Sequence, residues 1–296
     1  MPGETDLPEA ARRRLASRVA VSALTTAEHG ACLELGMEPI GIAQGYCVMQ
    51  WGFYLANSPY LRGNGLYQGG GGIYSETYAC PHGYGHEEPY RSWGQNYEQS
   101  YVEQAWASGF SLAHDRMVAE AVALGAHGVI GVLDTIGHVA DAGVREFHLQ
   151  GTAVVVRDAP TPRTPFVTYL SGQRLVKLVE AGWMPAGVVA SLASMRVWSY
   201  CVTQYQSEGN YGVDEMAQLT RAHAACFRLV SRAATAAASG DELHGLSLQT
   251  SEFEVGEGDF EIQYVLRASR VRRFKDFDPL PLATPVVRLL DAVESS

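Results

Sequence analysis

The sequence predicts an α+β protein: two tandem copies of a small antiparallel sheet covered by a helix, with a glycine- and tyrosine-rich insertion in the first copy. The main observation is an internal repeat. Seven residues recur with the same identity 146 positions later (170 − 24). They are Leu24, Glu34, Gly36, Pro39, Gly41, Met49 and Tyr54, which align with Leu170, Glu180, Gly182, Pro185, Gly187, Met195 and Tyr200. A second match at an offset of 115 (240 − 125) includes Gly125 with Gly240 and Leu133 with Leu248.

The two offsets fix the predicted domain plan. Their difference, 146 − 115 = 31, means that the first copy carries about that many extra residues before its main helix. Three prolines in RDAPTPRTP favour an extended, semi-rigid linker between the copies. We therefore divide the chain into an N-terminal helix (1–23), repeat 1 (24–157, insertion about 55–100), a Pro-rich linker (158–165), repeat 2 (166–277) and a C-terminal tail (278–296).

Each copy is expected to open with a short helix followed by a long strand. Thr25 or Thr26 followed by Glu28 is typical of a helix start, and Gly36 is typical of its end. The counterpart helix runs from about Ser171 to Gly182. Apolar, β-branched stretches then predict strands, with glycines that indicate bulges or close backbone approach (Gly41, Gly45 and Gly187): Ile40–Trp51 and Ala186–Trp198.

A main helix comes next in both copies. In the first copy a single apolar stripe steps by three or four residues through Val102, Trp106, Phe110, Ala113, Met117, Ala121 and Leu124. Gly125 is placed to end this helix in a left-handed conformation. In the second copy the stripe runs through Met216, Leu219, Ala222, Cys226, Leu229, Ala233 and Ala237, which falls beside the first at the repeat offset. Either the two helices dock differently or the alignment slips there.

Two strands complete each copy. Val129–Asp134 is a short apolar strand, and Glu146–Val155 alternates between apolar and polar residues, as does the stretch from Phe260 to Ala268. Such alternation is typical of antiparallel strands with one buried face. Each copy therefore reads helix–strand–helix–strand–strand, a sheet with a helix laid across it.

Composition restricts the function classes. A net charge of −10 argues against a nucleic-acid-binding surface. Two basic stretches, Arg12–Arg14 and Arg267–Lys275, are better read as a solvated helix face and as a strand-edge or subunit contact. Five cysteines without framework spacing suit a reducing compartment, the segment MPGETDLPEAARRR lacks the apolar core expected of a signal peptide, and no apolar run approaches about 18 residues. We expect a cytoplasmic protein without membrane insertion.

Several segments resemble a known family. The run AHDRMVAEAVALGAHGVIGVLD (Ala113–Asp134), the closing QGTAVVV (Gln150–Val156) and the opening LTT…ELGMEPIGIAQG are similar to the YbjQ-like family, which is described as heavy-metal-binding. The resemblance covers nearly all of the first copy except the insertion, and the second copy is a diverged version. It implies compact α+β units similar to dodecin subunits, which assemble into pentameric rings through strand pairing. It implies no established activity.

A fused tandem of such units constrains any homo-oligomeric ring. Five chains could build two stacked pentameric rings, or one ring could hold an even number of units. We expect the stacked rings. Assembly and binding of a ligand, either a metal ion or a small molecule between subunits, is the expected role.

One cluster has the composition of a metal site: Cys80, His82 and His86 lie close together in the insertion. Thiolate and imidazole ligands suit zinc or copper, and the neighbouring glycines let a short loop fold around an ion. Only three such ligands lie together and their spacing matches no known finger, so a packed surface loop is the alternative. A dedicated metal-binding protein is therefore a rival to the assembly hypothesis.

The insertion is also rich in tyrosine. Ten aromatic residues from Tyr54 to Tyr101 interrupt glycine-rich sequence, and tyrosines provide large, stiff contact areas in binding loops. This composition suits packing over a neighbouring subunit, lining of a ring opening or binding of a partner, and a disordered or loosely packed excursion is the alternative. We expect the ordered subunit contact, because so many aromatic side chains are costly to leave in water. No triad or phosphate-binding loop is found, since Gly69–Gly72 lacks the Lys-Ser/Thr of such a loop. Catalysis at a cleft between domains or subunits stays open as a further alternative.

Overall fold

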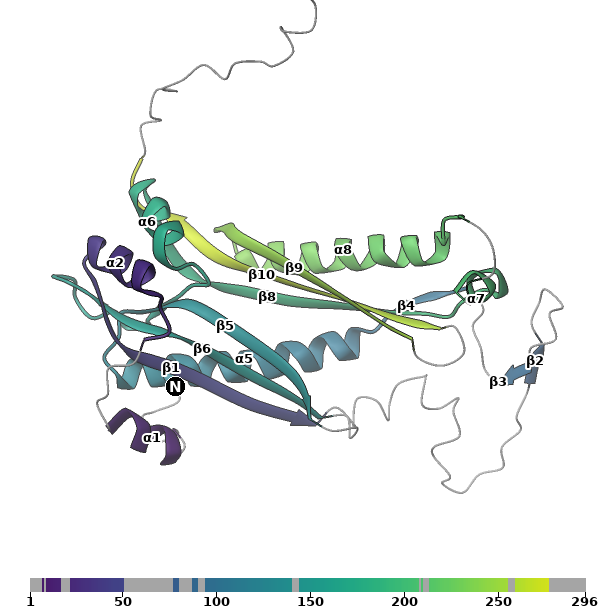
Figure 1. The fold of residues 1–296 in the computed structure, drawn as a ribbon, viewed down its shortest axis with the longest axis horizontal. Helices are drawn as coiled ribbons and strands as arrows, with labels where there is room; N and C mark the ends of the chain where they lie inside the picture. The colour runs from purple at the N-terminus through teal and green to yellow at the C-terminus, as the bar shows by residue number, and fades with distance from the viewer. Residues whose placement is uncertain are drawn as a thin grey trace, which may run out of the picture.

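The computed structural model describes residues 7, 9–16, 22–50, 77–79, 87–89, 94–139, 144–207, 209, 213–254 and 259–276. It shows an α+β fold with two four-stranded sheets, each packed against helices, which is consistent with two α+β units (Figure 1). The first sheet has the strand order β1-β6-β5-β7 and the second β4-β8-β10-β9. The fold class predicted from the sequence is confirmed at this level.

The two units have the same element order. The first consists of α2 (Thr26–Glu34), β1 (Met37–Gln50), α5 (Ser100–Ala123), β5 (Gly128–Val139) and β6 (Val144–Val156). The second consists of α6 (Gly172–Glu180), β8 (Trp183–Val197), α8 (Ala217–Ala238), β9 (Glu242–Glu254) and β10 (Phe260–Arg273). Six shorter elements were not delimited by the sequence or are shorter than expected: α1 (Glu9–Ala16), β2 (Thr77–Ala79), β3 (Glu87–Pro89), β4 (Asn96–Glu98), β7 (Phe166–Val167) and α7 (Cys201–Ser207).

The predicted helix ends are confirmed. Thr25 and Glu28 form a capping box at the start of α2, in which each side chain accepts a hydrogen bond from the backbone N–H of the other residue. Gly36 and Gly182 follow the two short helices with φ of 67° and 84°. Only glycine adopts such angles without strain, so these two positions end the helices and turn the chain into β1 and β8.

The predicted glycine positions in the strands are also confirmed. Gly41 and Gly187 lie at register shifts in the β1–β6 and β8–β10 pairs. Gly45 lets α5 lie against β1, since a Cβ atom there would stand 1.7 Å from the carbonyl oxygen of Ala113. The helix therefore packs backbone to backbone on the strand.

The strand registers resolve the displaced stripe of the second helix. Ala43 pairs with Gly151, and Val189, which is 146 residues later, pairs with Ala268. The equivalent offset for β6 and β10 is thus 268 − 151 = 117, not 115. At 117 the helix stripes coincide: Ala105, Gly109, Ala113, Met117 and Ala121 are buried in α5, as are Ala222, Cys226, Val230, Ala234 and Ala238 in α8. The alignment had slipped, and both helices dock on their sheets in the same way.

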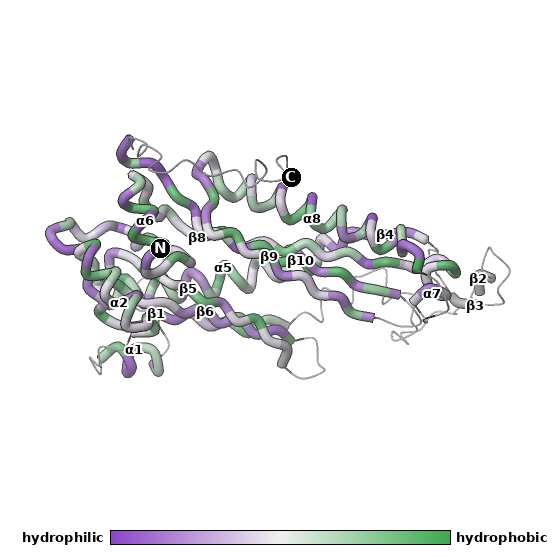
Figure 2. Tube along the Cα trace, turned by 45° about the horizontal axis from the view of Figure 1, so that its top comes forward, coloured by the Kyte–Doolittle hydropathy of each residue, from purple (hydrophilic) through white to green (hydrophobic). Residues whose placement is uncertain are grey.

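Burial in the second unit differs from the one-faced pattern that alternation predicted. The β10 residues Ile262 and Leu266 pack in the core under α8, while Val265 on the opposite face packs against the core around α5. The strand is therefore buried on both faces. Hydrophobic stretches run through strands of both sheets (Figure 2).

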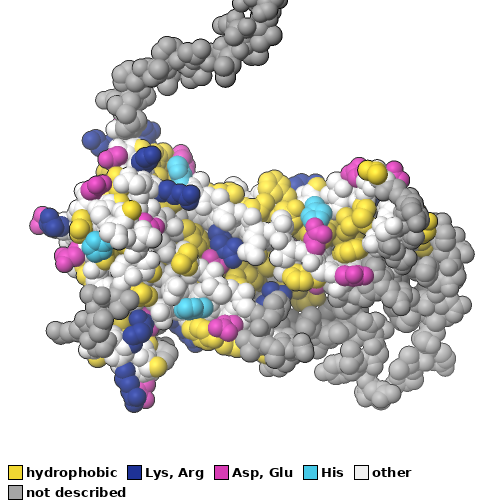
Figure 3. All heavy atoms as spheres, viewed as in Figure 1, with side chains coloured by type: hydrophobic (Ala, Val, Ile, Leu, Met, Phe, Trp, Pro, Cys, Tyr) yellow, Lys and Arg dark blue, Asp and Glu magenta, His cyan; other side chains and the backbone are white. Residues whose placement is uncertain are grey.

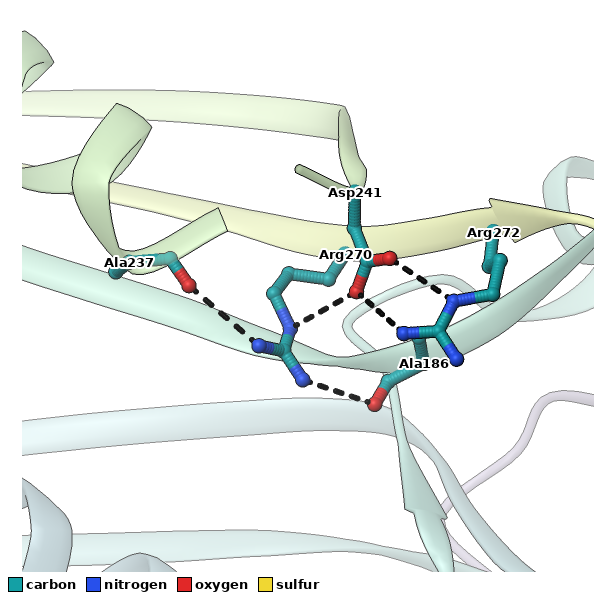
Figure 4. A network of polar contacts seen from close by, with 5 residues as sticks. All are labelled: Ala186, Ala237, Asp241, Arg270 and Arg272. Carbon is teal, nitrogen blue, oxygen red and sulfur yellow. Dashed lines mark hydrogen bonds and ion pairs between the residues drawn. The ribbon is translucent and has the colours of Figure 1, made fainter. Parts of the chain in front are cut away.

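The basic stretch in β10 has structural partners. Arg270 donates to the carbonyl oxygens of Ala237, at 3.5 Å, and Ala186, at 3.3 Å, and its Nε lies 3.7 Å from Asp241 (Figure 4). Arg272 binds the same carboxylate, with Nε at 3.0 Å. These two arginines connect the end of α8 to β8 and β10, although the Arg272 side chain itself is 70% exposed.

Candidate functional site

The predicted metal ligands Cys80, His82 and His86 lie outside the described residues, as does most of the tyrosine-rich insertion. Within the described ranges no group of three or more His, Cys, Asp or Glu side chains could hold a metal ion. Cys201 in α7 is disulfide-bonded, which an odd cysteine count did not predict, whereas Cys32, Cys47 and Cys226 are buried free thiols. The functional geometry that the structure does describe is the junction between the two units.

The first contact of this junction is between the second sheet and α5. One face of that sheet, here called the inner face, presents Val188, Ala190, Leu192 and Val265 to the core around α5. Beneath it lie Trp106 and Phe110, whose stacked rings have centroids 5.3 Å apart and which are only 1% and 8% exposed. The helix of the first unit is thus covered on one side by its own sheet and on another by the sheet of the second unit.

The second contact extends the edge of β5. The amide of Gly131 donates to the Leu170 carbonyl at 3.1 Å, and the amide of Val132 to the Thr168 carbonyl at 3.1 Å. Thr168 donates in turn to Val129 at 2.9 Å, next to the parallel pairing of β5 with β7. The chain entering the second unit therefore acts as an added strand on the first sheet.

The third contact joins α2 and α6. The Ser171 hydroxyl, at the start of α6, donates to the Glu28 carboxylate at 2.6 Å. Hydrogen bonds from Ser171 first, and from Thr25, lower the pKa of Glu28 below its ordinary value. The carboxylate that caps α2 thus also binds the neighbouring helix.

An ion pair closes the junction. Arg267 of β10 donates from Nε to both carboxylate oxygens of Asp134 in β5, each at 2.7 Å. The Asp134 side chain is 3% exposed. Both groups are largely removed from water, so each depends on the other.

The surface of α8 that corresponds to the covered side of α5 is open. At the offset of 117, His223 stands where Trp106 stands and Phe227 where Phe110 stands. Phe227 is 51% exposed, although Phe110 is buried. His223 binds the Tyr264 hydroxyl at 3.0 Å and Glu252 at 2.9 Å. We call His223 and Phe227 the α8 face.

The first sheet has the matching surface, which is partly exposed and is bordered on one side by α1. Gln44, Tyr46 and His148 occupy the positions that Ala190, Leu192 and Val265 hold on the inner face of the second sheet. Tyr46 is 47% exposed and its ring lies 5.9 Å from that of His148. Val48 and Leu133 add exposed apolar area, and hydrophobic patches are visible between charged groups in Figure 3. We call Tyr46, Val48, Leu133 and His148 the outer sheet face.

The outermost strands of the two sheets differ. In β1 the outward backbone groups are bound by side chains: Ile42 and Tyr46 accept from Arg14 and Arg116, and the Gln44 amide donates to Glu120. β9 pairs only with β10 among the described strands, and most of its residues are exposed. Its Gly245, with φ of 64°, corresponds to Gly131, with φ of 60°, at the point where β5 accepts the added strand.

Sequence reasoning missed this junction, although one signal was present. The stretch from Val188 to Val197 is nearly continuous in apolar and small residues, which is typical of a strand buried on both faces. A sheet with one helix can bury only one face. The second covered face therefore required another layer, which the structure shows to be the first unit.

Comparisons of the chain with protein-family models, curated proteins and solved structures find no match. Among the described helices, none has the length and apolar character needed to cross a membrane. Function has to be inferred from the geometry of the chain itself.

Proposed function

We propose that the chain is a non-enzymatic, ring-forming assembly protein whose two units are tandem copies of one YbjQ-like, dodecin-like unit. The junction within the chain joins one side of α5 to the inner face of the second sheet. The supporting observation is that the equivalent surfaces, on α8 and on the first sheet, are both exposed. The α8 face is open where the equivalent side of α5 is covered. The outer sheet face is exposed, whereas the equivalent inner face of the second sheet packs on α5.

In the assembly, the outer sheet face of one chain packs on the α8 face of the next. If two chains are related as the two units of one chain are, Ser22–Leu24, the counterpart of Thr168–Leu170, lies beside Gly245 in β9 of the neighbouring chain. Backbone pairing and apolar burial then act together, as they do within the chain.

Such a contact joins two different surfaces, so it propagates head to tail and ends only when a ring closes. Both units of a chain then belong to the same ring. This favours one ring with an even number of units over the two stacked rings expected from the sequence.

The contact between chains is weaker than the one within a chain. At the equivalent positions Asp134 is replaced by Leu248 and Arg267 by Gln150, so the closing ion pair has no counterpart. Assembly should consequently depend on protein concentration, whereas the junction within each chain should not.

The first test is native mass spectrometry of the wild-type protein and of Phe227→Asp and Tyr46→Asp. A charge on either surface would be desolvated in the contact, so both variants should be monomers while the wild type forms a closed oligomer. Val202→Asp is the control, because Val202 is 56% exposed on α7, outside both surfaces. A wild-type monomer, or intact rings in both variants, would overturn the proposal.

Mixing the two variants makes the test directional. Phe227→Asp retains a competent outer sheet face and Tyr46→Asp retains a competent α8 face. An equimolar mixture should therefore give a heterodimer that cannot grow further. If both charges disrupted a single symmetric contact, mixing would restore nothing, and the head-to-tail geometry would be wrong.

The same spectra address the rival role of a metal-binding protein. Metal held by Cys80, His82 and His86 would add one ion of zinc or copper per chain, lost in His82→Ala, without dependence on Phe227 or Tyr46. Rings that form without metal favour assembly as the primary role.

A further inference from the structure

A cleft of about 410 Å³ lies between the two units, beside their junction. One wall comes from α5, β5 and β6, and the other from β8, β9 and β10. Its size falls in the range of pockets that hold small organic molecules. The side chains that define its chemistry are Trp106, Asp134, Arg145, Phe253, Gln263 and Arg267.

The floor of the cleft is apolar. Trp106 and Leu192 are buried there, and Val265 packs against the same core. Phe253 of β9 also lines the cleft and is 41% exposed, so part of its side chain is accessible to a bound molecule. Two aromatic side chains and aliphatic residues favour a ligand with a flat apolar body.

One end of the cleft carries a fixed polar group. There the ion pair of Asp134 and Arg267 spans both walls, and Arg267 Nη1 donates to Gln249 at 3.3 Å.

A second cation lines the cleft from the first unit. Arg145 of β6 faces it, and burial of its guanidinium lowers the pKa of Arg145 while the Glu261 carboxylate raises it. Of the charged lining residues, Asp134 is paired with Arg267, and Arg145 lies within reach of the charge of Glu261, which is not a lining residue. Arginine binds carboxylates with two parallel hydrogen bonds, and such bonds are strong in a partly dry cleft.

We propose that this cleft binds a small aromatic carboxylate, with its carboxylate on Arg145 and its ring between Trp106 and Phe253. The cleft is formed within one chain, so this proposal is independent of the proposed ring. A monomeric Phe227→Asp protein should bind the same ligand, and failure of either proposal leaves the other testable.

Isothermal titration calorimetry with salicylate as the probe tests the site, with benzyl alcohol as a neutral analogue of similar shape. Salicylate should bind saturably, benzyl alcohol should bind at least about 10-fold more weakly, and Arg145→Gln should lower salicylate affinity by about 10-fold or more. Arg163→Gln, in the exposed linker, is the charge-matched control and should bind like the wild type. Absence of saturable binding, or equal binding in Arg145→Gln, would overturn the proposal.

A second measurement needs no variant, in case Arg145→Gln does not fold. Irradiation with 4-azidosalicylate followed by peptide mapping should label peptides from β6, β9 or β10, and excess salicylate should prevent the labelling. Label confined to other parts of the chain, or label that salicylate does not reduce, would contradict the site.

Discussion

Arg267 and Asp134 are 133 residues apart in the sequence, and the arginine Nε lies 2.7 Å from each carboxylate oxygen. The pair connects β10 of the second unit with β5 of the first, next to the apolar contact between the second sheet and α5. It therefore fixes how the two units face one another, and with that the walls of the cleft.

Asp134→Ala should destabilise the whole chain strongly. Removing one member of a buried pair leaves Arg267 with an uncompensated charge, at a cost of about 3–5 kcal/mol. Urea unfolding followed by circular dichroism would measure this loss. Asp276→Ala is the control, because its partner Arg273 is 3.6 Å away in an exposed pair and should contribute less than about 1 kcal/mol. Equal losses of unfolding free energy in the two variants would mean that the inter-unit pair stabilises the fold no more than an exposed pair does.

Gly45→Ala should separate α5 from β1. The added Cβ would stand 1.7 Å from Ala113 O and 2.7 Å from Met117 N, both backbone atoms that cannot move independently of the helix. We expect a loss of folded protein, observed as a fall in soluble expression and in the thermal midpoint. Gly30→Ala in α2 meets no atom within 4 Å and should instead stabilise by about 0.5–1 kcal/mol, as alanine favours helix.

Ser171→Ala should change the acid dependence of stability. The folded pKa of Glu28 is lowered below 4.5, mainly by the Ser171 hydroxyl, so its contribution is present above that pH and is lost as pH falls through the folded pKa. The variant should lose about 1 kcal/mol near neutral pH and progressively less below about pH 4.5. Unfolding free energies measured across this range would show the two curves converging. Ser108→Ala, which removes a hydroxyl that donates to the Gln104 carbonyl on the same helix, should give parallel curves.

Cys32 and Cys226 should resist alkylation in the folded protein. Burial raises the pKa of the Cys32 thiol to about 11 and of the Cys226 thiol to about 12, so neither forms the reactive thiolate near pH 8. Iodoacetamide labelling with peptide mass spectrometry should modify both only after denaturant is added. Rapid labelling in native buffer would show that the α2 or α8 packing opens readily.

Local chemistry was predictable from the sequence. The capping box of Thr25 and Glu28, the terminating Gly36 and the close approach at Gly45 all follow from single-residue conformational preferences. These preferences act over a few residues and do not depend on the rest of the fold, so pattern analysis found them.

The junction was not predictable, because it depends on which face of a helix meets a distant sheet. Trp106 and Phe110 were assigned to the same stripe as Ala113, although they also contact residues about 80 positions away, such as Leu192. The Arg267 partner was equally hidden, since its basic stretch was read as a strand-edge or subunit contact and Asp134 lies 133 residues away in the sequence. The proposed carboxylate cleft, which depends on the splay of two sheets, had no signal in the pattern.

The side chains bound along the edge of β1 distinguish it from β9, most of which is exposed. Glu120 accepts from the Gln44 amide and pairs with Arg14, so α1 helps to keep this edge from recruiting a foreign strand. A chain cleaved after Ala16 would lose that protection while keeping the open β9. Loss of the first 16 residues would therefore leave the chain with a less protected edge on each sheet, and such edges favour strand pairing between molecules.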